Sequence, residues 1–306
     1  MSLLYQYCVP LFALLLGLMS LYVIFFWNVQ KTRISDAWAF AFGSFYLLFF
    51  CYIFSLFRPP FAYLPFILLL ALFLRSVFRN KPATPLKKLS SRIVLYGSNI
   101  IYLIFIISFI DFLGSEYGNT PNEGVNLKSP LRNGDYLVFK GGVSPELNHH
   151  KPAKDQEWAL DIGMPHGFQE LKGFIDRDPT LFSVFGKNVH APCDGKIVTV
   201  VDRFKDLPVG EMDGKNGFGN HIGIDCIDSK GKPFQVRLAH LKSGSTRVTL
   251  GQRVRTGTLL AQVGNSGNTS FPHLHIDANF TDNSPAKAAP IQFERNFYRA
   301  FDVIHD

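Results

Sequence analysis

The first third of the chain is dominated by long apolar runs that contain no charged residue. Four such runs cover residues 9–27, 37–57, 59–74 and 93–110. A helix needs about 20 mostly apolar residues to cross a bilayer, and three of the runs meet this length. The third run is shorter, but it can extend past Arg75, whose long side chain can reach the membrane interface. The pattern predicts an α-helical membrane domain of four transmembrane helices over residues 1–113.

The pattern changes in the rest of the chain to short β-branched and aromatic runs separated by Gly, Asp and Asn. Such spacing is typical of an all-β domain with many short strands, and no helical period competes with it except near 290–301. Residues 114–134 are rich in Gly, Asn, Ser and Pro, which predicts a linker before a domain at 135–306. Strands are expected at 135–140, 196–202, 220–227, 234–241, 247–250, 259–263 and 273–278.

The formal net charge of +7 is confined to the apolar part. Residues 1–113 carry nine Lys/Arg against two Asp, whereas residues 114–306 carry 22 basic and 22 acidic residues. The balanced second part argues against nucleic-acid binding. Six of the nine basic residues lie between the third and fourth runs, and the positive-inside rule places that loop in the cytoplasm. We therefore expect a multi-pass protein of the cytoplasmic membrane, with the C-terminal domain on the periplasmic or extracellular side.

The four cysteines fall into two pairs. Cys8 and Cys51 lie inside apolar runs, where packing is their expected role. Cys193 and Cys226 would face an oxidising compartment, where a disulfide is allowed but is not fixed by the sequence. The chain has no C-x-x-C and no His-Glu-x-x-His, which excludes a structural zinc finger and a helix-borne zinc protease.

All nine histidines lie between His149 and His305. His273 and His275 follow a glycine-punctuated turn, and residues two apart on a strand point to the same face. Two imidazoles on one face can begin a zinc site, or can place one ligand beside one acid/base group. A pair of surface histidines is the competing interpretation for this segment alone.

Four segments of the second part resemble peptidase family M23, the lysostaphin/LytM-type zinc endopeptidases that cut bacterial peptidoglycan. The resemblance extends from residue 137 to residue 278. It includes the approach at 251–254 and 257–264 to the signature that ends in His-x-His. It implies a mainly antiparallel all-β LytM-type domain. The motifs that carry it are 148–150 with 156–162, 191–198, 237–241 and 264–275.

The resemblance also implies the site. Zn²⁺ would be held by His150 (or His149), Asp161 and His275, leaving the fourth position open as in catalytic zinc sites. His240 and His273 would do the proton chemistry, and the sequence does not say which is the base. The His-to-Asp spacing is longer than the short His-x-x-x-Asp of the best-known members, which leaves the first ligand open between the two adjacent histidines.

His150 is the expected ligand of that pair. Adjacent residues on an extended segment point to opposite faces, so only one of the two can readily reach the metal. In the membrane- or envelope-associated branch of the M23 family an Asn stands two residues before the ligand, and Asn148 has this position relative to His150. Asp277 is expected behind His275 or at the surface. The remaining histidines, which match no family position, are expected to have ordinary structural roles; they are His166, His190, His221 and His305.

The resulting expectation is a membrane-anchored zinc metalloendopeptidase that cuts cross-links or stem peptides of peptidoglycan. The alternative is a non-catalytic LytM-type module that binds the wall or regulates a partner hydrolase. A lipoyl- or biotin-type carrier fits the barrel-like glycine spacing, but it would not need the histidines and lacks its lysine hairpin. A transporter core has little support because no acidic residue lies deep in an apolar run.

Overall fold

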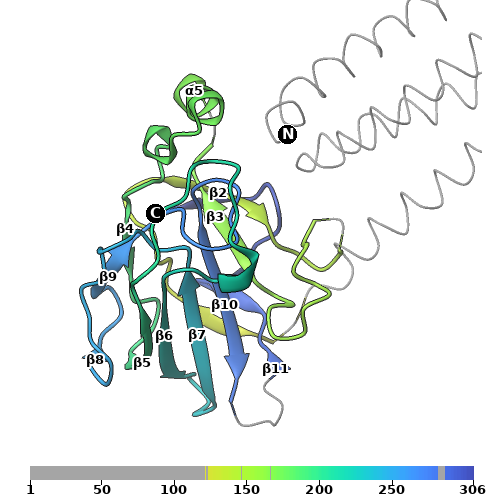
Figure 1. Cartoon of the computed structure of the whole chain (residues 1–306). Coiled ribbons are helices and arrows are strands. Elements are labelled where there is room, and N and C mark those ends of the chain that lie inside the picture. The colour runs from red at the N-terminus through yellow and green to blue at the C-terminus, as the bar shows by residue number, and fades with distance from the viewer. Residues whose placement is uncertain (1–120, 122, 146, 166, 282–286) are drawn as a thin grey trace, which may run out of the picture. The chain divides into compact units, whose positions relative to one another are not determined.

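The computed structural model describes residues 121, 123–145, 147–165, 167–281 and 287–306 (Figure 1). The four predicted spans, with Cys8 and Cys51, lie in residues 1–120, outside the described part. None of the helices within the described residues has the length and apolar character needed to cross a membrane. The chain divides after residue 114 into two units, and every described residue belongs to the second.

A nine-stranded sheet forms the centre of the domain, with strand order β14-β2-β3-β10-β7-β6-β5-β8 and β11 added to β10. Every pairing in this sheet is antiparallel, as expected. Strand β10 lies in the middle, with β3 on one side and β7 on the other (Figure 1). The strands are β2 (Asp135–Lys140), β3 (Leu160–Gly163), β5 (Gly195–Val201), β6 (His221–Ile227), β7 (Pro233–Ala239), β8 (Arg253–Val254), β10 (Leu274–Phe280), β11 (Lys287–Ala288) and β14 (Val303–His305).

Alternation along β10 separates the core from the polar site. Leu274, Ile276 and Ala278 belong to the hydrophobic core. His275 and Asp277 point to the other face, because successive side chains of a strand alternate between faces, yet both are only 1% exposed. The sheet is therefore covered on both sides at this position, with an apolar layer on one face and a buried polar group on the other.

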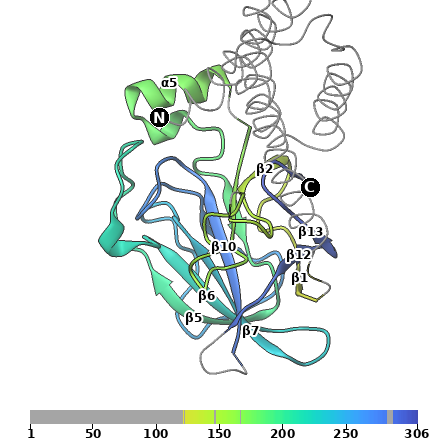
Figure 2. The same cartoon turned by 90° about the vertical axis from the view of Figure 1, so that its right-hand side faces the viewer.

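Two small sheets complete the β structure. Strand β4 (Asn188–His190) pairs with β9 (Leu259–Gln262). Strand β1 (Val125–Leu127) pairs in parallel with β12 (Ile291–Phe293), which also pairs with β13 (Asn296–Phe297) (Figure 2). Two expectations differ from the structure. Residues 247–250, expected as a strand, belong to none of the described strands, and β12 and β13 occur near 290–301, where a helical period was the one competing pattern.

The segment 114–134, predicted as a linker, contains part of the domain core. Val125 and Leu131 are fully buried, and β1 is hydrogen-bonded to β12. The many Gly, Asn and Pro residues of this segment indicated a loop, but its few apolar side chains have a partner strand that lies far away in the sequence. The described domain therefore includes residues before 135.

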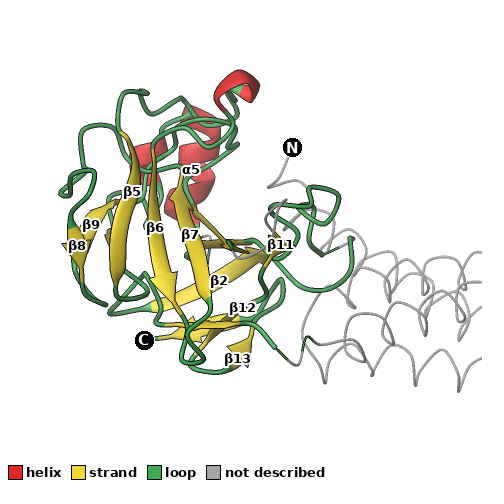
Figure 3. Cartoon of the chain, turned by 90° about the horizontal axis from the view of Figure 1, so that it is seen from below, coloured by secondary structure: helices red, strands yellow, loops and turns green. Residues whose placement is uncertain are grey.

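A helix that the sequence analysis did not expect, α5 (Phe168–Asp176), lies at one end of the sheet together with two short 3₁₀ turns, η3 (Pro179–Leu181) and η4 (Gly214–Asn216) (Figure 3). The Glu170 carboxylate accepts a hydrogen bond from the backbone N–H of Gly167, which caps the first turn of α5. Arg177 ends the helix in the left-handed conformation. At nine residues, α5 is too short for its apolar periodicity to stand out in the sequence.

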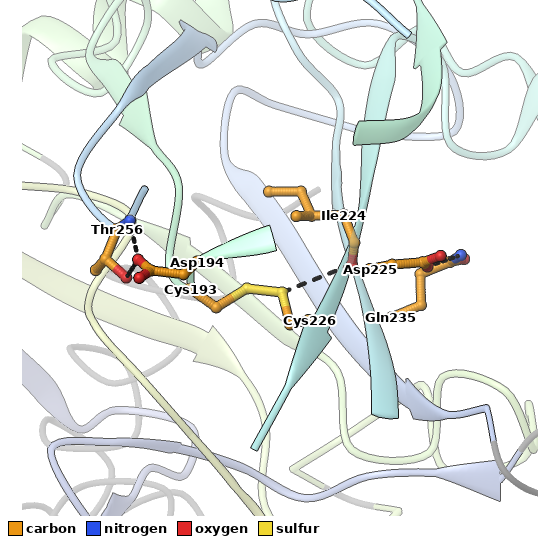
Figure 4. The surroundings of a disulfide bond; sticks show 7 residues. All are labelled: Cys193, Asp194, Ile224, Asp225, Cys226, Gln235 and Thr256. Carbon is orange, nitrogen blue, oxygen red and sulfur yellow. Dashed lines mark hydrogen bonds between the residues drawn. A yellow bond between two sulfur atoms is a disulfide. The ribbon is translucent and has the colours of Figure 1, made fainter. Parts of the chain in front are cut away.

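Cys193 and Cys226 form a disulfide that joins the turn before β5 to β6, closing a segment with a sequence separation of 33 (Figure 4). Hydrogen bonds flank it on both sides: Thr256 donates to Asp194, and Gln235 donates to Asp225. The structure thus pairs the two cysteines whose pairing the sequence left open.

Candidate metal centre and active site

The candidate site forms where β3, β10 and β7 pair. Asp161 of β3 stands directly opposite His275 of β10, and His275 stands opposite Ala239 at the end of β7. His240 follows β7 immediately, and His273 immediately precedes β10. Antiparallel pairing brings residues that are far apart in the sequence to the same end of the sheet.

Asp161 is the centre of this group. Its carboxylate is buried, and the Oδ1 atom lies 3.0 Å from Nδ1 of His275, 3.1 Å from Nε2 of His150 and 3.5 Å from Nε2 of His273. Its second oxygen, Oδ2, lies 3.9 Å from Nε2 of His149. The structure therefore brings together all three residues expected to bind metal and one of the two expected to transfer protons.

His275 lies between two carboxylates. Its Nδ1 faces Asp161, and its Nε2 lies 3.1 Å from Oδ2 of Asp277. Arg237 donates a hydrogen bond from Nε to the same oxygen at 2.8 Å, and Asn279 donates to Oδ1. Asp277 is thus buried behind His275 rather than at the surface. A carboxylate behind a ligating imidazole fixes its tautomer and orientation, leaving the other nitrogen free to bind metal.

His150 is carried by the loop between β2 and β3, and Asn148 holds this loop in shape. Asn148 is fully buried; its Nδ2 donates to the carbonyls of Gly142 and Glu157, and its Oδ1 accepts from the N–H of His150. A side chain that bonds the backbone two residues ahead forms an Asx turn. The Asn-x-His pattern therefore has a local physical cause.

The loop corrects one premise of the sequence analysis. His149 and His150 lie in a turn and not on an extended segment, so the alternation rule does not apply to them. Their rings lie side by side with centroids 3.9 Å apart, and both reach Asp161. The side chain of His149 is 56% exposed, whereas that of His150 is 11% exposed.

His240 has a backbone conformation that is uncommon for a residue other than glycine, with φ of 60°. It is held from both sides: its N–H donates to Phe218, and its carbonyl accepts from Gly264. Its Nδ1 lies 2.9 Å from the carbonyl oxygen of Ser266 and, as an N–H, donates to it. Nε2 then carries the lone pair, which is the state that a proton acceptor requires.

His273 is fixed in the same way. Its Nδ1 lies 2.8 Å from the carbonyl oxygen of Phe271 and 3.2 Å from the hydroxyl of Thr269. Its ring centroid is 5.0 Å from that of His240. Two imidazoles are thus anchored through Nδ1 by backbone carbonyls and lie next to each other beside Asp161.

The site contains shifted pKa values with clear causes. Burial alone would raise the pKa of Asp161, but the charge of His273 and the imidazoles of His150 and His275 hold it well below its usual range. Burial would lower the pKa of His275, whereas hydrogen bonds to Asp161 and Asp277 raise it to about 9. Burial, and then the charges of His273 and His275, lower the pKa of His240 well below its usual value, so His240 is neutral at pH 7.

The residues of the site fit a zinc ion. For bonds of about 2.0–2.1 Å, neighbouring ligand atoms of a tetrahedral site lie about 3.3 Å apart. The distances from Asp161 Oδ1 to His275 Nδ1 and to His150 Nε2 are 3.0 and 3.1 Å. Nε2 of His150 is buried and faces Oδ1 of Asp161, but the contact does not have the geometry of a hydrogen bond, as expected for two ligand atoms that face one ion. The ligand atoms of His149, His150 and Asp161 all lie within 4.8 Å of one another.

Residues outside the predicted set also shape the site. Asn220 is fully buried; its Oδ1 accepts from the N–H groups of Arg203 and Phe204, and its Nδ2 donates to the carbonyls of Phe204 and Leu241. Asn220 therefore ties the loop after β5 to the residue that follows His240. A buried asparagine between two apolar strands gives no periodic signal, so only the structure identifies this role.

The remaining histidines stand apart from Asp161. His221 contacts the carbonyl oxygen of Gly219 through Nδ1, and His305 lies 2.7 Å from Asp135. His190 belongs to β4 and pairs with Leu259 of β9. His166 lies outside the described residues.

Residues 180–286 match the model of peptidase family M23, so this part of the domain is similar to that family. The matched segment includes His240, His273 and His275 but begins after His150 and Asp161. The register of β3 on β10 therefore supplies the link between these two residues and the matched part.

Comparisons outside this family model are weaker. No curated protein sequence matches the chain. Among solved structures, a zinc-containing peptidase from Vibrio cholerae is 17% identical to this chain, with a TM-score of 0.30. The alignment covers 55% of this chain and 40% of the Vibrio chain. The catalytic domain of lysostaphin from Staphylococcus simulans is 20% identical, with a TM-score of 0.28. This alignment covers 58% of this chain and 92% of the lysostaphin domain. The chain thus spans less than half of the Vibrio protein. TM-scores this low do not establish a shared fold over the whole chain.

Proposed function

We propose that the protein is a zinc endopeptidase of the M23 type that cuts peptide bonds in peptidoglycan, with His150, Asp161 and His275 as metal ligands. The observation that carries the proposal is the convergence of these three side chains with His240 and His273 at one end of a sheet. Zinc, when bound at such a site, lowers the pKa of its water toward 7 and polarises the scissile carbonyl group.

The protein's own residues supply the remaining chemistry. Asp277 holds Nε2 of His275, which directs Nδ1 toward the ligand position. His240 and His273 both donate from Nδ1 to a backbone carbonyl, so Nε2 is the atom through which each can exchange a proton. Nε2 of His273 also lies 3.5 Å from Oδ1 of Asp161. One imidazole, with Nε2 unprotonated, can take a proton from the attacking water, while the other, protonated at Nε2, donates to the developing oxyanion or the leaving amine. Both histidines act through Nε2, so the two roles are distinguished by experiment.

The experiment uses the full-length protein purified in detergent with purified peptidoglycan sacculi, and mass spectrometry identifies the released muropeptides. We expect cleavage that a chelator abolishes and zinc restores. His240→Ala and His273→Ala keep one zinc per chain but lose turnover by about 10²–10⁴-fold, the usual contribution of a general acid or base. Near-normal cleavage by either variant would remove that residue from the mechanism.

The same assay tests the competing function. A protein that binds zinc and sacculi but releases no muropeptide would be a non-catalytic wall-binding or regulatory module. Cleavage of protein substrates without cleavage of sacculi would retain the peptidase chemistry and change the substrate.

We also propose that the protein is anchored in the cytoplasmic membrane with this domain on the outer side. The support is the charge distribution of residues 1–113 and the Cys193–Cys226 disulfide, because disulfides persist in oxidising compartments. Reporter fusions at Lys87 and after Leu131 are expected to lie on opposite sides of the membrane. Reporters on the same side would mean that one apolar run does not span the membrane, and the peptidoglycan assignment would lose its basis.

A further inference from the structure

Arg237 is a charged residue near the site to which the proposed mechanism gives no role. It belongs to β7 and stands directly opposite Asp277 of β10. Its side chain is only 22% exposed, and arginine side chains are rarely buried unless they are paired. The structure shows three partners for Arg237, and each comes from a different segment of the chain.

The first partner is Asp277. Nε of Arg237 donates to Oδ2 of Asp277 at 2.8 Å, and the same oxygen lies 3.1 Å from Nε2 of His275. The Asp277 side chain is 2% exposed, and a carboxylate buried this deeply requires a charged partner. A histidine that binds a metal ion is neutral, so the permanent positive charge beside Asp277 is that of Arg237.

The other two partners hold the guanidinium group of Arg237. The ring centroid of Phe218 lies 3.5 Å from Cζ, which is a cation–π contact. Phe218 is itself fixed near the site, because its carbonyl accepts from the N–H of His240. Nη2 lies 3.5 Å from Oδ2 of Asp155 in the β2–β3 loop, but Asp155 is exposed and such a pair contributes little. The contact with Phe218 therefore does most to orient the guanidinium group.

We infer that Arg237 is a positioning residue for the proposed metal site and acts on His275 through the carboxylate of Asp277. The inference rests on the proposed zinc site and adds one residue to it. Arg237 holds Oδ2 of Asp277 in place, and this oxygen accepts the proton carried by Nε2 of His275. Nδ1 of His275 then keeps its lone pair toward Asp161 and the metal position.

The experiment measures the zinc affinity of the full-length protein in detergent, by competition with a chromophoric chelator. Arg237→Met keeps an unbranched apolar side chain on Phe218 but removes the donor and the charge. We expect zinc binding to weaken by about 10–100-fold, the usual effect of losing a group behind a ligand. Arg253→Met is the matched control, because Arg253 is an exposed strand residue of β8 at the edge of the sheet, and its zinc affinity should equal that of the wild type.

Arg237→Gln separates positioning from packing. The amide nitrogen of glutamine is as many bonds from the backbone as Nε of arginine, so it can donate the same hydrogen bond to Asp277 without the charge. We expect its zinc affinity to lie between those of wild type and Arg237→Met. A side chain needed only for packing would give the opposite order, because methionine packs well on an aromatic ring.

The Asp277→Asn background tests the route of the effect. The effects of independent residues multiply to within about twofold, whereas those of residues that act through one contact do not. We therefore expect Arg237→Met to weaken zinc binding by less than about threefold when residue 277 is already asparagine, although it costs about 10–100-fold in the wild type.

The outcomes separate the inference from the proposed function. Unchanged zinc affinity of Arg237→Met, or an equal loss in both backgrounds, overturns the inference and leaves the three-ligand site intact. A wild-type protein that binds no zinc overturns the proposed function and the inference with it. If Arg237→Met does not fold, Arg237→Gln is compared in the same two backgrounds. A loss that disappears with Asp277→Asn supports the inference, and an equal loss or none overturns it.

Discussion

Replacement of Asn148 by alanine tests whether the β2–β3 loop preorganises the site. The side chain is fully buried and makes three hydrogen bonds to the backbone of its own loop. Asn148→Ala removes all three and leaves the carbonyls of Gly142 and Glu157 without these donors. His150 stays in the sequence but loses the turn that positions it.

The magnitude follows from the hydrogen bonds. Each contributes about 0.5–1.5 kcal/mol, so the three together contribute about 1.5–4.5 kcal/mol. If zinc binding must reorder the loop, this free energy is lost from zinc affinity. A change of 1.4 kcal/mol is a factor of ten, so we expect Asn148→Ala to bind zinc about 10- to 10³-fold more weakly.

The assay is competition for zinc with a chromophoric chelator, and Lys154→Ala is the matched control because Lys154 is exposed in the same loop. Asn148→Asp keeps the acceptor for the N–H of His150 but places a buried carboxylate oxygen against the carbonyl oxygens of Gly142 and Glu157, so its affinity should be no higher than that of Asn148→Ala. Equal zinc affinity for wild type and Asn148→Ala would refute the reasoning, because the loop would then hold His150 without the Asx turn.

Three further predictions concern stability. Cys193→Ser opens a loop with a sequence separation of 33, which should lower the free energy of unfolding by about 3–4 kcal/mol. Denaturant titration measures this change, and reduction of the wild type with dithiothreitol should lower its stability by the same amount. Burial would raise the pKa of Glu170, but hydrogen bonds from Ser183 and backbone N–H groups lower it. Its stabilising contribution is therefore complete above the unfolded value of about 4.3 and is lost as the pH falls through the lower folded pKa. Glu170→Gln should therefore destabilise at pH 7, and by progressively less as the pH falls below the unfolded value. Gly219→Ala should destabilise the protein by more than about 1 kcal/mol, because the φ of Gly219 is 56° and an added Cβ would lie 2.3 Å from a backbone oxygen. Gly214→Ala is the control and should not destabilise the protein, because a Cβ at Gly214 would meet no atom within 4 Å.

Much of the sheet followed from the local pattern of the sequence. The strand expected at 135–140 matches β2, and those at 196–202 and 220–227 match β5 and β6 within a residue. Strand β6 places an apolar residue at every second position, β5 contains the β-branched run 197–201, and β2 is rich in aromatic and aliphatic residues, all of which favour a strand. Strands β1 and β12 are only three residues long and are stabilised by each other, so neither could be recognised alone.

In the candidate site, too, some positions were predictable from the local sequence and others depend on distant parts of the chain. The positions of His273 and His275 follow from strand periodicity, because the two residues are neighbours on one chain segment. The approach of His149 to Asp161 could not be predicted, because it depends on a turn that Asn148 stabilises and on which face of β3 meets β10. Arg237 gave no signal either, since its contact with Asp277 is made across paired strands.

The pairing of β3 with β10 has a consequence for the order of events during synthesis. Asp161 and His275 are 114 residues apart in the chain, although they are direct neighbours in the sheet. A growing chain that has not reached residue 275 carries the His149, His150 and Asp161 cluster without the strand that positions it. Its partial affinity for metal ions would be unselective, because selectivity depends on the complete ligand geometry. For the proposed metal site, correct loading would therefore follow translation of β10, and a ribosome stalled before β10 would expose an incomplete chelating loop.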